Sequence, residues 1–305
     1  MSINTQSLNN PIHEKSVLSG ELKINIVEWG EADAPVIIML HGLRAYARTW
    51  NRVALALADR YRIVALDQRG RGKSDWGPSE EYFTPNYVSD LKNVVDALGL
   101  KHFILLGHSM GGATALVFSS LYSDYLDGLI IEDIGPGSSA GSDGADRIKD
   151  ELNHTPRTFE TRAQARSFWR DARPSAPDEA IEDRLDHMMI EDDDGQMRWR
   201  YDLEGIAKAR LDPDVTKIPD LWPPISKLSV PTLVLRGENS DFLPLKVMAE
   251  MSERNPNISA HEISGASHYI HDDNFDEFMM RLEAFLAALS QTDSVADLSD
   301  ERNSA

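Results

Sequence analysis

Short apolar runs alternate with amphipathic stretches along most of the chain. The runs are rich in β-branched residues and have turn residues at or near their ends: Lys23–Trp29, Val36–Leu40, Arg62–Leu66, His102–Leu106, Leu129–Ile134, Thr232–Leu235 and Ser259–Ile263. This pattern is typical of strands buried in a parallel sheet. Helical segments such as Ala47–Asp59, Val88–Leu98 and Ala113–Tyr122 lie between most of them. The alternation therefore predicts an α/β fold in which helices cover both faces of a mostly parallel sheet.

One interval, from about Gly135 to Ile225, shows no clear strand run. Its helical pattern is clearest at Ile181, Leu185, Met188 and Met189, which fall on one helix face. We expect a helical cap over residues 136–225, standing over the sheet edge where open α/β folds bind ligands. The main α/β domain would then span residues 16–135 and 226–290, between loose polar tails at 1–15 and 291–305.

Composition narrows the classes of partner. The 305 residues include 31 basic and 50 acidic side chains, a net charge of −19, and no cysteine. Such a charge disfavours nucleic acid and anionic membranes, and the absence of cysteine excludes disulfides and thiolate metal sites. The first residues lack a secretory signal, and no run approaches a membrane span. We expect a cytoplasmic protein that binds a small-molecule substrate without a cofactor; whether it forms a homodimer is left open.

The segment His102–Gly112 carries the strongest chemical signal. It reads HFILLGHSMGG, an apolar strand followed by a sharp turn and small residues that open a helix. A serine hydroxyl must be held exposed beside a base to act as a nucleophile, and a strained strand-to-helix turn achieves this. Gly107 and Gly111 give such a turn room. A serine that merely caps a helix is the alternative, but the flanking strand and helix favour Ser109 as the nucleophile.

An acyl-transfer site also needs two backbone N–H groups for the developing oxyanion. One would come from Met110, directly after the serine. The other would come from the loop after the Val36–Leu40 run, where Leu43 follows His41 and Gly42. We expect His41 to shape this loop by a hydrogen bond rather than to act in catalysis.

The base should lie downstream of the serine. His268 follows the last strand run in SGASHYIHDD and precedes the C-terminal helix. His271 is its rival, and the two could be a metal pair, but no third ligand is evident nearby, so we expect no metal.

A buried carboxylate should orient the base. Asp241 ends TLVLRGENSD and Asp133 ends LIIED, each after a strand run and each in the order Ser–Asp–His. Position favours Asp241, with Asp133 as the alternative acid. Either could instead be an ordinary turn residue.

A second motif, Asp67–Ser74 (DQRGRGKS), ends like a phosphate-binding loop. That pattern requires glycine at position 67, where this chain has aspartate. We therefore expect a basic loop packed near the site and no nucleotide.

Taken together, these segments resemble the α/β-hydrolase superfamily. The matches are His41-Gly42, DQRGRGKS, GHSMGG at 107–112, RGENSD and GASH at 265–268, in the family's order over about residues 20–290. The resemblance implies an eight-stranded, mostly parallel sheet with a helical cap between the sixth and seventh strands. It assigns the same roles to Ser109, His268, Leu43 and Met110. The family's usual spacing from Gly237 would put the acid at Ser240.

The segments IIEDIGP and GQMRWRYDLEGI also resemble the YbfF-type small esterases. In that branch the aspartate after the sixth strand joins the site, which keeps Asp133 as a candidate. The resemblance implies hydrolysis of a small ester or lactone through an acyl-enzyme. Cleavage of a carbon–carbon, amide or carbamate bond by the same residues is the alternative, as is a slow ligand sensor.

The cap should set specificity. We expect pocket-lining side chains among the large apolar residues Trp169, Met188, Met189, Trp199 and Tyr201, each of which could instead be cap core. A row of arginines could attract a carboxylate-bearing substrate, or be a solvated helix face: Arg162, Arg166, Arg170 and Arg173.

Overall fold

The computed structural model describes residues 12–138, 142–174 and 176–303. An eight-stranded sheet, in the order β1-β2-β4-β3-β5-β6-β10-β11, forms its centre. All neighbouring strands pair in parallel except β1 with β2 and β2 with β4. The strands are β1 (His13–Ser19), β2 (Leu22–Trp29), β3 (Val36–Leu40), β4 (Arg62–Leu66), β5 (Phe103–His108), β6 (Leu126–Glu132), β10 (Thr232–Gly237) and β11 (Ile258–Ile263).

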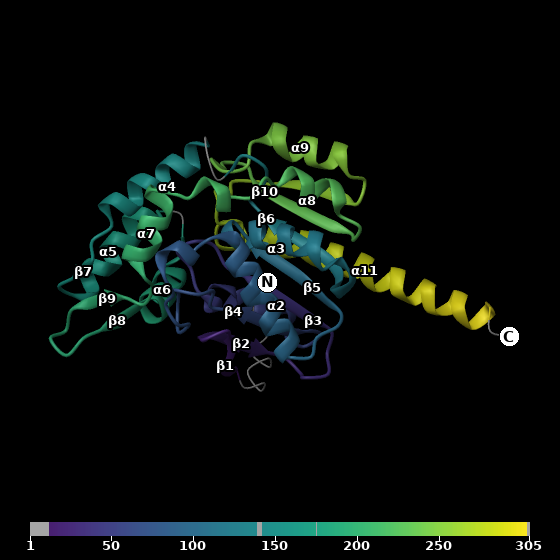
Figure 1. Ribbon diagram of the computed structural model, residues 1–305, viewed down its shortest axis with the longest axis horizontal. Coiled ribbons are helices and arrows are strands. Elements are labelled where there is room, and N and C mark those ends of the chain that lie inside the picture. Colours follow the sequence, from purple (N-terminus) through teal and green to yellow (C-terminus); the bar gives the residue numbers. More distant parts are fainter. Residues whose placement is uncertain (1–11, 139–141, 175, 304–305) are drawn as a thin grey trace.

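Helices cover both faces of this sheet, as predicted (Figure 1). In β3 the side chains alternate: Ile38 and Leu40 join the core under α2, α3, α8 and α9, whereas Ile37 and Met39 join the core under α1, α10 and α11. The helices are α1 (Asn51–Leu57), α2 (Thr84–Ala97), α3 (Met110–Leu121), α8 (Trp222–Lys227), α9 (Leu245–Arg254), α10 (Ile270–Asp273) and α11 (Phe275–Asn303). Short 3-10 helices add η2 (Ala47–Trp50), η3 (Ser79–Glu81), η4 (Ser123–Tyr125) and η5 (Val215–Lys217).

Residues 143–211, which we call the cap segment, lie between β6 and β10 and form a separate layer beside the sheet (Figure 1). They contain α4 (Asp143–His154), α5 (Arg162–Ala172), α6 (Asp178–Met188) and α7 (Leu203–Leu211). They also contain a small antiparallel sheet, β7-β9-β8, which the sequence pattern did not predict: β7 (Thr158–Phe159), β8 (Met189–Glu191) and β9 (Met197–Trp199). The cap segment contributes most of a third apolar cluster, which also includes Tyr46, Tyr82, Phe83, Tyr87 and Met110.

The predicted boundaries need three corrections. Helix α8 packs on α3 and α9, so residues 222–225 belong with the main sheet rather than with the predicted cap. Strand β1 starts at His13, inside the tail predicted for residues 1–15, of which 1–11 lie outside the described residues. Helix α11 continues through Asn303, so residues 291–303 are helical rather than loose, and the helix projects away from the body (Figure 1).

None of the described helices combines the length and the apolar character that crossing a bilayer requires.

Candidate active site

Ser109 lies on a sharp turn between the end of β5 and the start of α3. Its backbone has φ 53° and ψ −116°. Residues other than glycine rarely adopt a positive φ. The turn is also tightly packed: a Cβ on Gly107 would lie 2.4 Å from the carbonyl oxygen of Gly111, and a Cβ on Gly111 would lie 2.4 Å from that of Leu40. Only glycine fits at both positions, and this packing holds the serine at the edge of the sheet.

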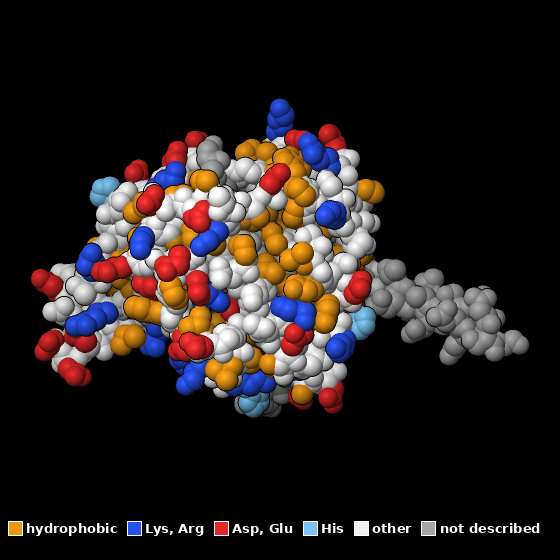
Figure 2. Space-filling model, viewed as in Figure 1, with side chains coloured by type: hydrophobic (Ala, Val, Ile, Leu, Met, Phe, Trp, Pro, Cys, Tyr) orange, Lys and Arg blue, Asp and Glu red, His pale blue; other side chains and the backbone are white. Residues whose placement is uncertain are grey.

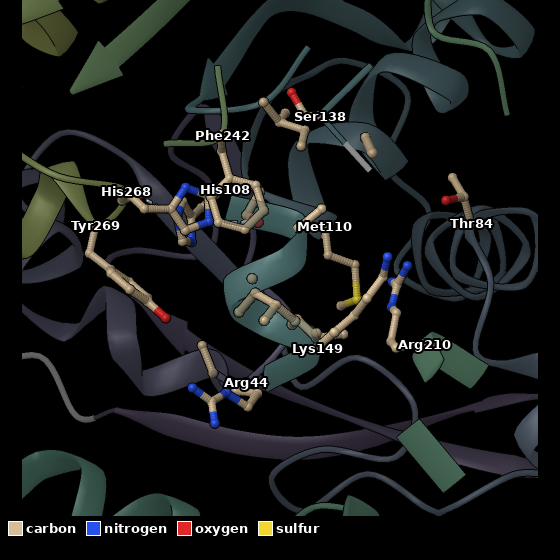
Figure 3. A pocket seen from close by; sticks show the side chains of 18 residues that line it. Arg44, Thr84, His108, Met110, Ser138, Lys149, Arg210, Phe242, His268 and Tyr269 are labelled. Atoms are coloured by element: carbon tan, nitrogen blue, oxygen red, sulfur yellow. Dashed lines mark hydrogen bonds between the residues drawn. The ribbon is translucent and has the colours of Figure 1, made fainter. Parts of the chain in front are cut away.

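Ser109 and His268 are joined in the structure. The Ser109 hydroxyl donates to Nε2 of His268 over 2.9 Å, and Nδ1 of His268 donates to the Asp133 carboxylate over 2.7 Å. All three residues are buried, His268 with 4% of its surface exposed. The Phe242 ring stacks on the imidazole at 3.9 Å between centroids, which restricts the imidazole's rotation (Figure 3). The three side chains form the arrangement that a nucleophile, its base and an orienting acid require.

Asp133 reaches the histidine because of its own backbone turn. It directly follows β6, is fully buried and has a positive φ of 53°. Its carboxylate accepts the backbone N–H of Gly237 at 3.1 Å and the hydroxyl of Ser240 at 2.6 Å, in addition to His268. Three donors therefore fix this carboxylate in place.

Asp241 was the acid that we preferred from its position in the sequence, but it forms no hydrogen bond or ion pair with His268 among the described residues. Its carboxylate instead accepts two hydrogen bonds from Arg147 of α4, at 2.7 and 3.2 Å, and its carbonyl oxygen accepts the N–H of Gly144. The structure thus corrects the preferred assignment: the loop after β10 turns Asp241 toward the cap segment and directs Ser240 toward Asp133.

Burial opposes charge on both members of the Asp133–His268 pair. It raises the pKa of the Asp133 carboxyl, against which the hydrogen bonds from Ser240 and Gly237 act. It also lowers the pKa of the His268 imidazole, and the Arg147 cation adds to that fall. A lowered pKa keeps the imidazole neutral at pH 7, which is the form that can accept a proton from serine.

The other two histidines singled out in the sequence have structural contacts. His41 accepts the N–H of Gln68 at 3.0 Å and donates to the carbonyl of Gly42, so it shapes its loop as expected. His271 binds Glu132 through both its backbone N–H and Nδ1 and does not contact Ser109. Within the described part of the chain, no group of three or more His, Asp or Glu side chains gathers as a metal site would require.

The loop Asp67–Ser74 is held by its first residue. The Asp67 carboxylate accepts the N–H groups of Ala47 and Lys73 and the side-chain amide of Asn25. Arg71 from the same loop donates to the carbonyl of Leu43 and reaches the sulfur of Met110. The loop therefore packs beside the site, as predicted.

A cavity of about 840 Å³, open solvent at its mouth included, lies over Ser109 (Figure 3). Leu43 and Met110 both line it together with Ser109 and His268. Met110 is the first residue of α3, where a helix leaves its N–H groups without an internal acceptor. The remaining lining residues come from the loops after the strands, α2, α3 and the cap segment: Gly42, Arg44, Ala45, Thr84, His108, Ala113, Ile134, Ser138, Ala145, Ile148, Lys149, Arg210, Phe242 and Tyr269.

The large apolar residues expected to line the pocket do not do so: Trp169, Met188, Met189, Trp199 and Tyr201. All five side chains belong to a buried cluster that the cap segment shares with residues below it: Tyr46, Tyr82, Phe83, Tyr87 and Met110. Within this cluster the Trp199 ring contacts the rings of Trp169 and Tyr201. The helical stripe correctly indicated burial, but these side chains are buried between the cap segment and the residues below it and do not line the cavity.

The arginine row is neutralised by neighbouring carboxylates. Arg162 and Arg166 pair with Glu182, and Arg170 pairs with Asp178. Arg173 is buried against Asp272. Acidic and basic side chains accordingly lie interspersed over the cap segment (Figure 2). The row is therefore a set of ion pairs and offers no free charge to a substrate.

Sequence reasoning missed three residues at this site. Ser240 supports the carboxylate, Phe242 stacks on the imidazole, and Arg210 brings a cation from α7 into the cavity. The family spacing did point to position 240, although for an acid. No pattern in the sequence distinguished Arg210 from the other arginines.

Comparison with known proteins agrees with this fold. The sequence profile described as alpha/beta hydrolase fold matches residues 35–275. A 2-(acetamidomethylene)succinate hydrolase of Mesorhizobium japonicum is 25% identical, over 83% of this chain and 87% of its own length. The sn-1-specific diacylglycerol lipase ABHD11 of Mus musculus is 30% identical, over 87% and 85%. The crystal structure of E-2-(acetamidomethylene)succinate hydrolase superposes with a TM-score of 0.82 at 23% identity, covering 91% of this chain and all of that one. The chain therefore belongs to the α/β-hydrolase family and is a hydrolase.

Proposed function

We propose that this hydrolase cleaves a small-molecule ester or lactone through a covalent acyl-enzyme on Ser109. The observation that carries the proposal is the hydrogen-bonded chain from Ser109 through His268 to Asp133, at 2.9 and 2.7 Å. The names of the relatives, which include a lipase and a succinate-derivative hydrolase, support hydrolysis without fixing the bond that is cleaved.

In the first half of the reaction the Ser109 oxygen attacks the ester carbonyl carbon, and its proton passes to Nε2 of His268. Asp133 holds the imidazole by Nδ1 and stabilises the imidazolium that forms. The backbone N–H groups of Leu43 and Met110 bind the oxyanion. His268 then gives its proton to the leaving alcohol oxygen, and the acyl group stays on Ser109.

In the second half a water molecule attacks the acyl carbon while His268 accepts its proton. Collapse of this second tetrahedral intermediate returns the proton to Ser109 and releases the carboxylic acid. Water is consumed, and one acid and one alcohol leave. A lactone would give both groups on one product molecule.

The test is covalent labelling with a fluorophosphonate probe, followed by turnover of p-nitrophenyl acetate, p-nitrophenyl butyrate and a γ-lactone. We expect labelling of the wild type that disappears in Ser109→Ala and persists in Ser120→Ala. Ser120 is a fitting control because it lies on the same helix, where its hydroxyl binds only the carbonyl of Val117. Folded wild-type protein that takes up no probe would contradict the proposal.

A further inference from the structure

The charged side chains that line the cavity over Ser109 are all basic, although the chain as a whole is acidic. Three of its lining side chains are positively charged, namely Arg44, Lys149 and Arg210, and none of the described lining residues is Asp or Glu. The whole chain carries a net charge of −19. The lining of the cavity therefore has the opposite charge from the chain as a whole.

The three cations differ in how they are compensated. Arg44 forms an ion pair with Glu151, and Lys149 pairs with Asp146. Arg210 of α7 is partly buried, yet in the described part of the chain its guanidinium has neither an ion pair nor a hydrogen bond. Burial lowers its pKa, and so does the Arg71 cation nearby. Among the three lining cations, Arg210 is thus the one without a carboxylate partner in the described part of the chain.

Arg71, behind this site, makes the local excess of positive charge larger. It is fully buried, and its donors go only to uncharged acceptors: the carbonyls of Leu43 and Arg69, the hydroxyl of Tyr87 and the sulfur of Met110. Two neighbouring guanidinium groups therefore share one region without a carboxylate between them. A buried charge in a protein is ordinarily paired, because an unpaired one loses its hydration without compensation. Arg71 is such a buried charge, and Arg210 is the partly exposed neighbour that an anion in the cavity could reach.

We propose that the missing counter-ion is a carboxylate of the substrate itself, which pairs with Arg210. This rests on the proposed function, because the same molecule presents its ester to Ser109. In the view of Figure 3, Arg210 lies on the other side of Met110 from His268, and Lys149 lies beside it. The substrate class is accordingly an ester that carries a free carboxylate away from the bond that is cleaved, such as a half-ester of a dicarboxylic acid.

The kinetic test compares two p-nitrophenyl esters of matched chain length, the hemiglutarate and the pentanoate. We expect Arg210→Met to lower the ratio of their kcat/KM values, anionic over neutral, by about 10- to 100-fold, as the loss of a charged hydrogen bond implies. Arg210→Lys should keep part of the ratio. Added NaCl should lower the ratio for the wild type, because salt screens the attraction.

Arg162→Gln is the matched control, since it removes a cation whose partners lie on the outer surface of the cap segment. We expect it to leave the ratio unchanged. A ratio that Arg210→Met does not alter, or that Arg162→Gln alters equally, would overturn the proposal.

A binding experiment separates this proposal from the hydrolytic one. Sodium glutarate should raise the melting temperature of Ser109→Ala, and should do so much less for Ser109→Ala/Arg210→Met; inorganic phosphate at equal ionic strength should have little effect on either. Stabilisation by glutarate without turnover of any ester would leave the anion site standing and remove the hydrolytic role. Equal stabilisation by phosphate, or by glutarate in both variants, would exclude a carboxylate site at Arg210.

Discussion

Two aspartates follow neighbouring strands of the same sheet, but they differ in burial and in the groups that they bind. Asp133 follows β6, is fully buried and binds His268, Ser240 and the N–H of Gly237. Asp241 follows β10, keeps 31% of its side chain exposed and pairs with Arg147 of the cap segment. One carboxylate is enclosed at the active site, and the other ties a loop to the cap.

Chain order and position at the end of a strand are therefore not enough to identify the carboxylate that binds the histidine. The family spacing places the acid at position 240, and here a serine occupies that position. Its hydroxyl lies 2.6 Å from the carboxylate of Asp133, so the two strand ends still meet at the same point. In this chain the carboxylate lies after the neighbouring strand, and Ser240 supports it with a hydrogen bond.

Replacing each aspartate in turn should have the largest effect on kcat and tests directly which of the two is the acid. Asp133→Asn should lower kcat for a p-nitrophenyl ester by about 10⁴-fold, because the asparagine neither fixes the histidine tautomer nor stabilises the imidazolium. Asp241→Asn should change kcat by less than about threefold, since it removes no contact to His268. Steady-state kinetics of both variants decide the matter, and the reverse ranking would break the assignment.

A double variant tests whether the two strand ends are interchangeable. Adding Ser240→Asp to Asp133→Asn should recover about tenfold or more of the lost kcat, because a carboxylate at 240 would lie close to Nδ1 of His268. Asp133→Asn/Ser240→Asn is the uncharged control and should recover nothing. If both double variants behave alike, position 240 cannot carry the acid in this fold.

The pH dependence of stability should have opposite signs for the two aspartates. Burial raises the pKa of Asp133, so the folded state binds its proton more tightly, and the stability this gives is lost as pH rises from about 4 to 7. Arg147 holds the pKa of Asp241 below its usual value despite burial, so the stability from that pair is lost as pH falls below about 4.

Urea unfolding at pH 5 and pH 8 measures this difference. The free energy of unfolding of Asp133→Asn should improve relative to wild type as pH rises, by on the order of 1 kcal/mol per pH unit at most. For Asp241→Asn the difference from wild type should stay constant over the same range. A constant difference for Asp133→Asn as well would mean that its carboxyl titrates as it does in water.

The smallest effect concerns the tie between loop and cap. Asp241→Asn should cost about 0.5–1 kcal/mol at pH 7, because the pair with Arg147 is partly exposed and screened by solvent. For a chain of this size that is a fall of about 1–2 °C in Tm. Asp33→Asn, at an exposed aspartate in the loop between β2 and β3, is the control for loss of a surface charge and should leave Tm unchanged. A larger fall would indicate that the tie also orders the cap segment.

Much of the sheet could be predicted because its strands are continuous apolar runs. Val36–Leu40 and Arg62–Leu66 match β3 and β4 residue for residue. Strand β1 was missed because it lies at the sheet edge and buries only Val17 and Ser19. The strands of the small cap sheet are two or three residues long, which is too short to show an alternation of apolar and polar residues.

The site was predictable only as far as local pattern reaches. Ser109 and His268 follow from a turn motif and from chain order, both of which are visible in the sequence. Asp133 reaches His268 because its backbone has a positive φ, and an aspartate at that position in the sequence does not predict a positive φ. Arg210 could not be singled out from the sequence, because its lack of a carboxylate partner depends on which side chains lie near it in the folded molecule.

Ser109 and Asp133 are the non-glycine residues with positive φ among those the structure describes. Glycine would remove the backbone strain at either position, but at position 133 it would also leave the N–H of Gly237, the Ser240 hydroxyl and Nδ1 of His268 without their shared acceptor. Engineering toward heat resistance should therefore exempt these positions from consensus or entropy-based redesign, since any gain there would be made at the expense of catalysis.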